Sequence, residues 1–96
     1  MPEALGMIEC RNMTPVFAAA DTMLKKHAVT LLGYEQAKFS VTLLVYGELE
    51  EVKKALTVGS NAAERVGEIV ALHIIPSPHQ KLLTTPGLNL NFSYQE

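Results

Sequence analysis

The side chains that most often do chemistry are few in this chain, and their spacings form no known catalytic or metal site. The histidines are His27, His73 and His79, and the single cysteine is Cys10. Because no His-x-x-x-His or Cys-x-x-Cys pattern occurs, no zinc site of ordinary spacing is predicted. Cys10 precedes Arg11, a cation that would favour the thiolate. Since free cysteine is usually buried, we interpret Cys10 as a small hydrophobic residue.

An acidic cluster and an arginine-asparagine pair are the other candidates for a catalytic site. Glu48, Glu50 and Glu51 lie close together, but acidic side chains are favoured where a helix begins, which is sufficient reason for their position. Arg11 and Asn12 are adjacent, and a small acylphosphatase-like enzyme would need both residue types around a phosphate. We predict no catalytic residue and no metal site, with such an enzyme kept as an alternative.

Length and composition place these residues in one folded domain. Of 96 residues, 48% are hydrophobic and 19% charged, which is too apolar for disorder and too short for two domains. Eight Lys and Arg against ten Asp and Glu give a net charge of -2 and no basic stripe for nucleic acid. The single cysteine favours a reducing compartment. Without a signal peptide or an apolar run of about 18 residues, we expect neither secretion nor membrane insertion.

The hydrophobic pattern predicts six elements in the order strand, helix, strand, strand, helix, strand. β-branched and aromatic runs bounded by turn residues are typical of strands, and apolar residues three and four apart are typical of helices. The short polar piece 35–38 predicts a hairpin between the second and third strands. The expected strands are 5–10, 29–34, 39–46 and 69–75, and the expected helices are 14–27 and 48–66.

Caps and small residues further define the two helices. Thr14 can cap the first helix, Pro15 suits its first turn, and Phe17 belongs to its apolar face. Gly59 and several alanines make the apolar face of the second helix unusually small. We therefore expect this helix to lie close against a sheet or another subunit, with Gly67 as its C-cap.

The order of elements is that of an α+β, ferredoxin-like fold with a split βαβ arrangement. Such a fold has a four-stranded antiparallel sheet with two helices on one face. Beyond it, a C-terminal tail has Leu88, Leu90, Phe92 and Tyr94 alternating with polar residues. This tail is either an extra strand, docked on its own subunit or on a neighbour, or a loosely ordered terminus.

Several motifs, in order and with nearly the expected spacing, resemble one known family. They are ALGMIE at 4–9, AD with Met23 and Lys25 at 20–25, LLGYE at 31–35, AA followed by VGE at 62–68, and HIIPSPH at 73–79. The chain resembles the bacterial microcompartment shell proteins of the single-domain, hexamer-forming kind. The resemblance covers residues 4–80, as a shell domain, and leaves 81–96 as the tail.

The resemblance implies a structural function without enzymatic activity. Six copies would form a flat homohexameric tile, and tiles would join each other and other shell proteins edge to edge. The resulting shell would enclose pathway enzymes in the bacterial cytoplasm, with small metabolites passing through a central pore. No cofactor is expected, because family members that hold an iron-sulfur cluster have a cysteine in the pore loop and residues 36–40 contain none. The alternative is an oligomeric, ligand-sensing regulator of the same fold.

The resemblance also implies which residues form the hexamer edge. Lys25 matches the lysine that meets its mate in the adjoining tile, and this role is favoured over the alternative of an ordinary cation at the end of a helix. Ser77 replaces an arginine and Ala28 replaces an asparagine of the family, so that two hydrogen-bonding groups are missing from the expected tile contact. The predicted edge residues are Lys25, Ala28, Pro76, Ser77, Pro78 and His79.

The expected pore loop, with Ala37, Lys38, Phe39 and Ser40, departs most from the family. Family members have a glycine- and serine-rich loop here, whereas this loop lacks glycine and is one residue shorter. Six copies of Lys38 would form a cationic ring that attracts anions, and six copies of Phe39 an apolar constriction. The alternative interpretation is that Phe39 begins the next strand, pointing inward, and that Lys38 is a solvated turn residue.

Overall fold

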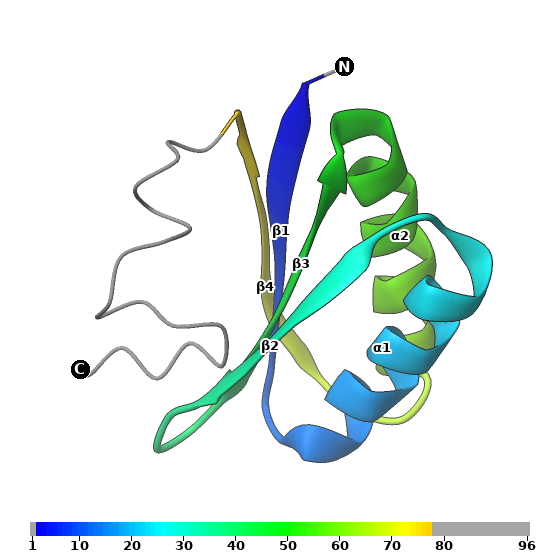
Figure 1. Ribbon diagram of the computed structural model, residues 1–96. Helices are drawn as coiled ribbons and strands as arrows, with labels where there is room; N and C mark the ends of the chain where they lie inside the picture. Colours follow the sequence, from blue (N-terminus) through cyan, green and yellow to red (C-terminus); the bar gives the residue numbers. More distant parts are fainter. Residues whose placement is uncertain (1, 78–96) are drawn as a thin grey trace.

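The computed structural model describes residues 2–77 of the chain (Figure 1). The tail, Pro78 and His79 lie outside the described residues. The six predicted elements follow one another in the predicted order. They are β1 Glu3–Cys10, α1 Met13–Lys26, β2 Thr30–Gln36, β3 Val41–Glu48, α2 Leu49–Glu64 and β4 Ile69–Pro76.

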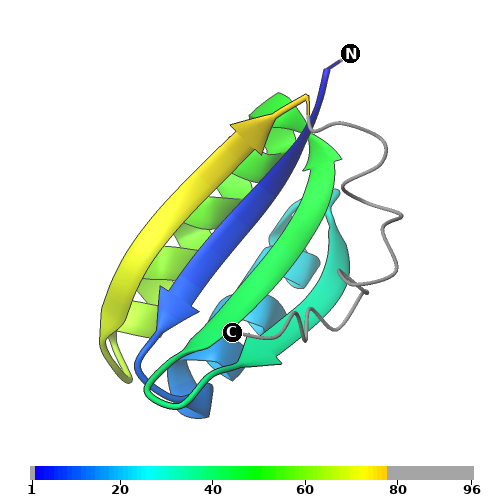
Figure 2. The ribbon, with the colours of Figure 1, turned by 90° about the vertical axis from the view of Figure 1, so that its left-hand side faces the viewer.

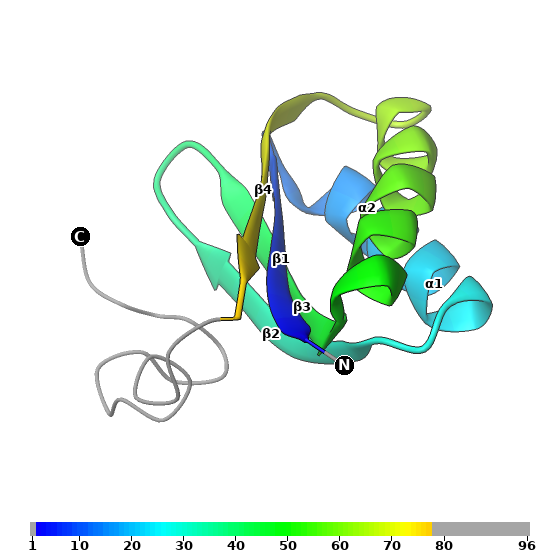
Figure 3. The ribbon, with the colours of Figure 1, turned by 90° about the horizontal axis from the view of Figure 1, so that it is seen from above.

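The four strands form one antiparallel sheet in the order β2-β3-β1-β4. Both helices lie on the same face of this sheet, so that the domain has two layers (Figure 3). Figure 2 shows the opposite face, with the strands in front and the helices behind them. The predicted α+β, ferredoxin-like fold is confirmed.

The main core lies between the helices and the sheet. Ala4, Ile8 and Cys10 face the helices because alternate residues of a strand point to the same side. Gly6 belongs to the same row, and a Cβ there would lie 2.8 Å from Cγ1 of Val52 on α2. The glycine therefore allows α2 to approach the sheet closely, as the small face of this helix predicts.

The face of α1 that contacts the core differs from the predicted one. Val16, Ala19 and Met23 are buried, whereas Phe17 is 62% exposed. The rotation of the helix follows from Gly59 on α2, where a Cβ would lie 2.7 Å from Cγ of Met23. Met23 fills the space that the glycine leaves, and Phe17 then points away from the core.

The predicted N-cap of α1 is wrong. The helix begins at Met13, so that Asn12 is its N-cap and Thr14 already lies in the first turn. Asn12 has the extended backbone that is typical of an N-cap, but its side chain makes no capping hydrogen bond.

The predicted C-cap of α2 is also wrong. The helix ends at Glu64, and its C-cap is Arg65 rather than Gly67. Gly67 is required for packing instead, because a Cβ there would lie 2.5 Å from Cγ of Pro15 at the start of α1.

The turn between β2 and β3 is displaced by two residues from its predicted position. It occupies 37–40, because β2 continues to Gln36 and β3 begins only at Val41. The pairing of the strands shifts between Leu31 and Gly33, which marks a β-bulge in β2. Gly33 has a φ of 143°, a conformation that glycine adopts readily.

Candidate functional site

The turn that joins β2 to β3 presents two large side chains to solvent. The backbone N–H of Ala37 donates to the carbonyl oxygen of Ser40 at 2.8 Å and closes the turn. Lys38 is exposed, Phe39 is 72% exposed, and the lysine Nζ lies 5.5 Å from the centroid of the phenyl ring. This is a cation–π distance. The interpretation of Phe39 as an inward-pointing strand residue is therefore wrong.

The far ends of the strands bring three of the predicted edge residues together. Pro76 pairs with Ala4 of β1, and Ala4 pairs with Gly47 of β3. The carbonyl oxygen of Ala28 lies 3.2 Å from where a Cβ on Gly47 would be. Ser77 follows Pro76 directly, and its N–H donates to the carbonyl oxygen of Glu3 at 2.7 Å. Three neighbouring segments thus form one end of the domain.

Lys25, the predicted edge cation, lies in the last turn of α1. Its Nζ is 3.1 Å from Oδ2 of Asp21, one turn earlier, and both side chains are largely exposed. An ion pair this exposed contributes little to stability. Lys25 is therefore accessible to a second molecule, and it also complements the helix dipole together with Lys26.

The turn and this edge lie at opposite ends of the sheet. Gln36, the last residue of β2, pairs with Val41, which in turn pairs with Cys10. Pro76 and Ala4 pair at the other end of the same strands. In Figure 2 the β2–β3 turn is at the bottom and the end of β4 is at the top. The predicted pore residues and the described edge residues are therefore separated by the length of the strands.

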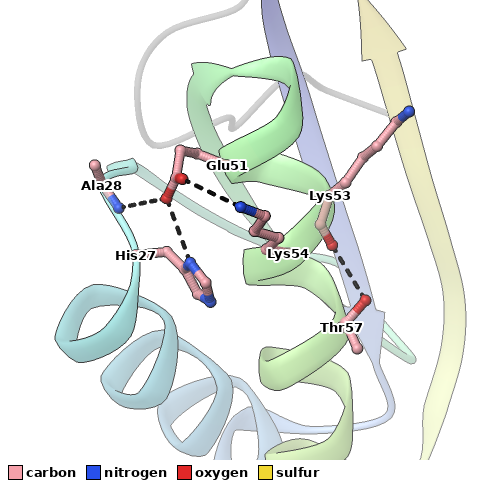
Figure 4. A network of polar contacts seen from close by, with 6 residues as sticks. All are labelled: His27, Ala28, Glu51, Lys53, Lys54 and Thr57. Atoms are coloured by element: carbon pink, nitrogen blue, oxygen red, sulfur yellow. Dashed lines mark hydrogen bonds and ion pairs between the residues drawn. The ribbon is translucent and has the colours of Figure 1, made fainter.

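A carboxylate on α2 holds the segment that follows α1 (Figure 4). Oε1 of Glu51 accepts the backbone N–H of Ala28 at 3.1 Å and lies 3.3 Å from Nδ1 of His27. Its Oε2 lies 3.9 Å from Nζ of Lys54. The backbone hydrogen bond from Ala28, followed by the contacts with His27 and Lys54, lowers the pKa of Glu51 from its ordinary value of 4.5, although burial opposes the shift. The cluster explains Glu51 without a catalytic role.

Replacing Glu51 with glutamine is expected to lower thermal stability at pH 7. Because folding lowers the pKa of Glu51, its charge stabilises the fold above the unfolded value of 4.5, and this contribution is lost as the pH falls through the lower folded value. The difference in melting temperature between wild type and Glu51→Gln should thus be full at pH 7 and shrink below 4.5. Thermal unfolding followed by circular dichroism measures it.

Glu50→Gln is the matched control for this prediction. Glu50 lies in the same first turn of α2, but its contact is an exposed ion pair with Lys53 at 3.5 Å. Both substitutions remove one charge near the helix N-terminus. The role of the contacts to His27 and Ala28 would be contradicted by an equal decrease in melting temperature in the two variants. It would also be contradicted if the difference in melting temperature between wild type and Glu51→Gln did not change with pH.

The other reactive residues have structural explanations. Cys10 is buried, and burial together with the nearby charge of Glu9 raises the pKa of its thiol. Its interpretation as a small hydrophobic residue is confirmed. Nη2 of Arg11 lies 3.4 Å from Oε2 of Glu68, and Asn12 occupies the N-cap position of α1 without a side-chain capping hydrogen bond. A carboxylate beside the arginine disfavours a phosphate there, so the alternative of an acylphosphatase-like enzyme loses its support.

Two further properties concern the described part of the chain as a whole. Among residues 2–77, no group of three or more His, Cys, Asp and Glu side chains is arranged to hold a metal ion. Within the same range, neither helix has the length and hydrophobicity needed to cross a lipid bilayer.

Apolar side chains are exposed along both edges of the sheet. On the side of β2 these are Leu31, 39% exposed, and Tyr34, 43% exposed. On the side of β4 they are Val70, 43% exposed, and Leu72, 45% exposed. An open groove adjoins the β4 side between α2 and the strand. It is lined by Lys53, Leu56, Thr57, Ser60, Leu72, His73 and Ile74.

The described residues define a small α+β domain of the split βαβ class, with apolar side chains exposed on two opposite sides. Within this class the sequence match is specific. The model of the BMC domain matches residues 4–78, and the chain belongs to this family of bacterial microcompartment shell proteins. Shell proteins of this family are structural, and this chain is not an enzyme.

Relatives agree with this assignment, and a solved structure agrees with the fold. The bacterial microcompartment shell protein PduA of Citrobacter freundii is 46% identical over 78 residues, which are 80% of this chain and 84% of that protein. The carboxysome shell protein CcmK2 of Thermosynechococcus vestitus is 45% identical over 85 residues, 85% and 83% of the two chains. A microcompartment protein from Desulfitobacterium hafniense superposes with a TM-score of 0.79 at 24% identity, and this whole chain spans 51% of its length.

Proposed function

We propose that six copies of this chain form a flat shell tile with a central pore. Family membership and the shell proteins named above support a role in a microcompartment shell. The observation that carries the hexameric tile is the separation of the two predicted contact regions. The β2–β3 turn lies at one end of the sheet, and Ala28, Pro76 and Ser77 lie at the other. A subunit of a ring needs its pore residues and its rim residues at opposite ends, because one end faces the axis and the other faces the rim.

The two sides of the domain supply the contacts between neighbouring subunits. In a closed ring each subunit contacts the next through two different surfaces. With the turn at the axis, these surfaces are the β2 side, with Leu31 and Tyr34, and the β4 side, with Val70 and Leu72. Both sides expose apolar side chains, whose burial stabilises association.

The turn residues then determine what passes through the pore. Six exposed Lys38 ammonium groups form a cationic ring around the axis, which attracts small anionic metabolites and repels cations. Phe39 narrows the opening with an apolar ring and holds the ammonium groups by its cation–π contact. Ala37 and Ser40 anchor the turn through their backbone hydrogen bond.

The rim connects the tile to the remainder of the shell. Lys25, Ala28, Pro76 and Ser77 face the adjoining tiles, together with Pro78 and His79. Tiles of this chain and of other shell proteins enclose pathway enzymes in the bacterial cytoplasm. Ala28 and Ser77 have short side chains. The contact between tiles therefore has fewer hydrogen bonds than it would have with larger polar residues at these two positions beside Lys25.

Native mass spectrometry and electron microscopy test the hexamer directly. We expect six times the subunit mass of 10.5 kDa, and rings in both low and moderate salt. A monomer, dimer or trimer would contradict the tile and would favour the ligand-sensing regulator, with the groove between α2 and β4 as the place for its ligand.

A further inference from the structure

The helix-free face of the sheet has an apolar cluster of its own. Leu5 of β1 and Leu44 of β3 point away from the helices, because their neighbours in sequence belong to the main core. They pack with Met7, Leu32 and Ile75, which are partly buried. This second cluster occupies the half of the sheet nearest the end of β4, since Leu5 pairs with Ile75.

The cluster is more deeply buried than a bare sheet face would be. Leu5 is 2% exposed and Leu44 is 3% exposed, values as low as those of the main core. Both helices of residues 2–77 lie on the other side of the sheet (Figure 3). A leucine on one face of a sheet reaches such burial only when something lies over it as well as beside it. This face therefore has a cover that the six described elements do not supply.

The chain leaves the sheet beside this cluster. β4 ends at Pro76, and Ser77 has a φ of 49°, which turns the backbone away from the line of the strand. The N–H of Ser77 is still bound to Glu3 at the start of β1. The described chain thus ends, at Ser77, beside the end of the sheet where Leu5 and Ile75 pair.

The sequence of the tail complements an apolar face. Leu88, Leu90, Phe92 and Tyr94 alternate with polar residues, so that an extended segment has all four on one side. At about 3.3 Å per residue, 88–94 extends roughly 20 Å, comparable to an eight-residue strand. The BMC domain match ends at residue 78, so this segment is an addition to the shared domain.

We propose that the C-terminal tail folds back over the helix-free face of its own subunit, with Leu88, Leu90, Phe92 and Tyr94 on the apolar cluster around Leu5 and Leu44. One flat face of the domain is then covered by tail residues, and their outward polar side chains become its surface. The proposal concerns the single subunit and does not depend on the hexamer.

Tryptophan fluorescence tests the docking, because the chain has no tryptophan of its own. Phe92→Trp places the probe on the apolar side of the tail, and Ser93→Trp places it on the polar side one residue away. We expect blue-shifted emission and several-fold weaker iodide quenching for Phe92→Trp than for Ser93→Trp, independent of protein concentration. Equal emission and quenching in the two variants would overturn the proposal. So would a red shift of Phe92→Trp on dilution, which would indicate docking on a neighbouring copy.

A charge on the sheet face identifies the partner of the tail. Met7→Asp, added to Phe92→Trp, puts a carboxylate into the apolar cluster and is expected to shift the emission to the red. Asn61→Asp adds the same charge at an exposed position of α2 and should leave the emission unchanged. Far-UV circular dichroism confirms that both variants are folded. If the emission of Phe92→Trp is blue-shifted and does not change when Met7→Asp is added, the tail docks elsewhere and the proposal is overturned.

Discussion

Replacing Tyr34 or Leu72 with aspartate is expected to convert the proposed six-subunit ring into single subunits. Tyr34 lies on the β2 side and Leu72 on the β4 side, and each is more than two-fifths exposed in the single chain. In the proposed ring each of the six contacts between subunits would bury one copy of both residues. Burying an unpaired carboxylate against an apolar surface costs several kcal/mol per contact. Native mass spectrometry should therefore show one subunit mass in place of six.

Mixing the two variants identifies how the subunits contact each other. Tyr34→Asp keeps an intact β4 side and Leu72→Asp keeps an intact β2 side, so one unmodified contact forms between them. Since the two remaining sides are both blocked, the mixture should contain dimers with one subunit of each kind and nothing larger. Dimers in either variant alone would indicate a contact between identical surfaces and would contradict the ring.

The control variant is Asn61→Asp, which introduces the same charge change at an exposed position of α2 away from both sheet edges. It should retain the six-subunit mass. Because positions 34, 61 and 72 are exposed in the folded chain, all three variants should remain folded, which far-UV circular dichroism checks. The two variants that lose the ring are expected to melt at a lower temperature than Asn61→Asp, because association stabilises the folded subunit. Rings that persist in both Tyr34→Asp and Leu72→Asp would exclude these sides as the contact surfaces.

The residues on which this test depends could be found only in part from the sequence. The β-branched and apolar runs at 29–34 and 69–75 correctly predict two strands. Such runs do not tell which strands are at the edges. Strand order depends on how the two helices cross over the sheet, and Leu31 and Leu72 have the pattern of core residues although they are exposed.

Contacts between residues far apart in the sequence account for the other differences between the predicted and the observed structure. Which face of α1 contacts the core depends on the space above Gly59, some forty residues later in the chain. The residues around Phe17 therefore do not indicate that its side chain is exposed. Glu51 has a sufficient local explanation at the start of α2, yet its main contact is the backbone of Ala28. The turn lies at 37–40 because β2 continues to Gln36 and β3 begins at Val41, and the bulge beside Gly33 is visible only in the register of the strand pair.

The positions of the candidate site residues illustrate the same limit. Their residue types and numbers follow from the sequence and its family resemblance. That Ala28, Pro76 and Ser77 share one end of the sheet, opposite Lys38 and Phe39, follows only from the pairing of β1 with β3 and β4. The roles of these residues stay predictions.

If the β2–β3 turn lines a pore as proposed, replacing Lys38 with glutamate is expected to invert the charge selectivity of that pore. An ion about 8 Å from each ammonium group gains roughly 0.5 kcal/mol per group in water, or about 3 kcal/mol from six. Screening at physiological ionic strength, with a Debye length of about 8 Å, reduces this sum to about 1 kcal/mol. Since glutamate turns the attraction of anions into repulsion and the repulsion of cations into attraction, the free-energy difference between the two ions changes by about 4 kcal/mol, and the ratio of anion to cation passage should fall by a factor on the order of 1,000.

The test compares the entry of an anionic and a cationic dye of equal size into closed shells that contain the protein. Lys26→Glu changes the total charge equally, but its position at the end of α1 is remote from the turn, so it should leave the ratio unchanged. Because screening controls the effect, the difference between wild type and Lys38→Glu should shrink as salt is added. Phe39→Ala, by contrast, should increase the passage of both dyes, since it widens an apolar constriction without changing charge. If Lys38→Glu and Phe39→Ala both leave the two rates unchanged in intact rings, the β2–β3 turn does not line the pore, whereas the assembly of the ring through the sides of the sheet would still stand.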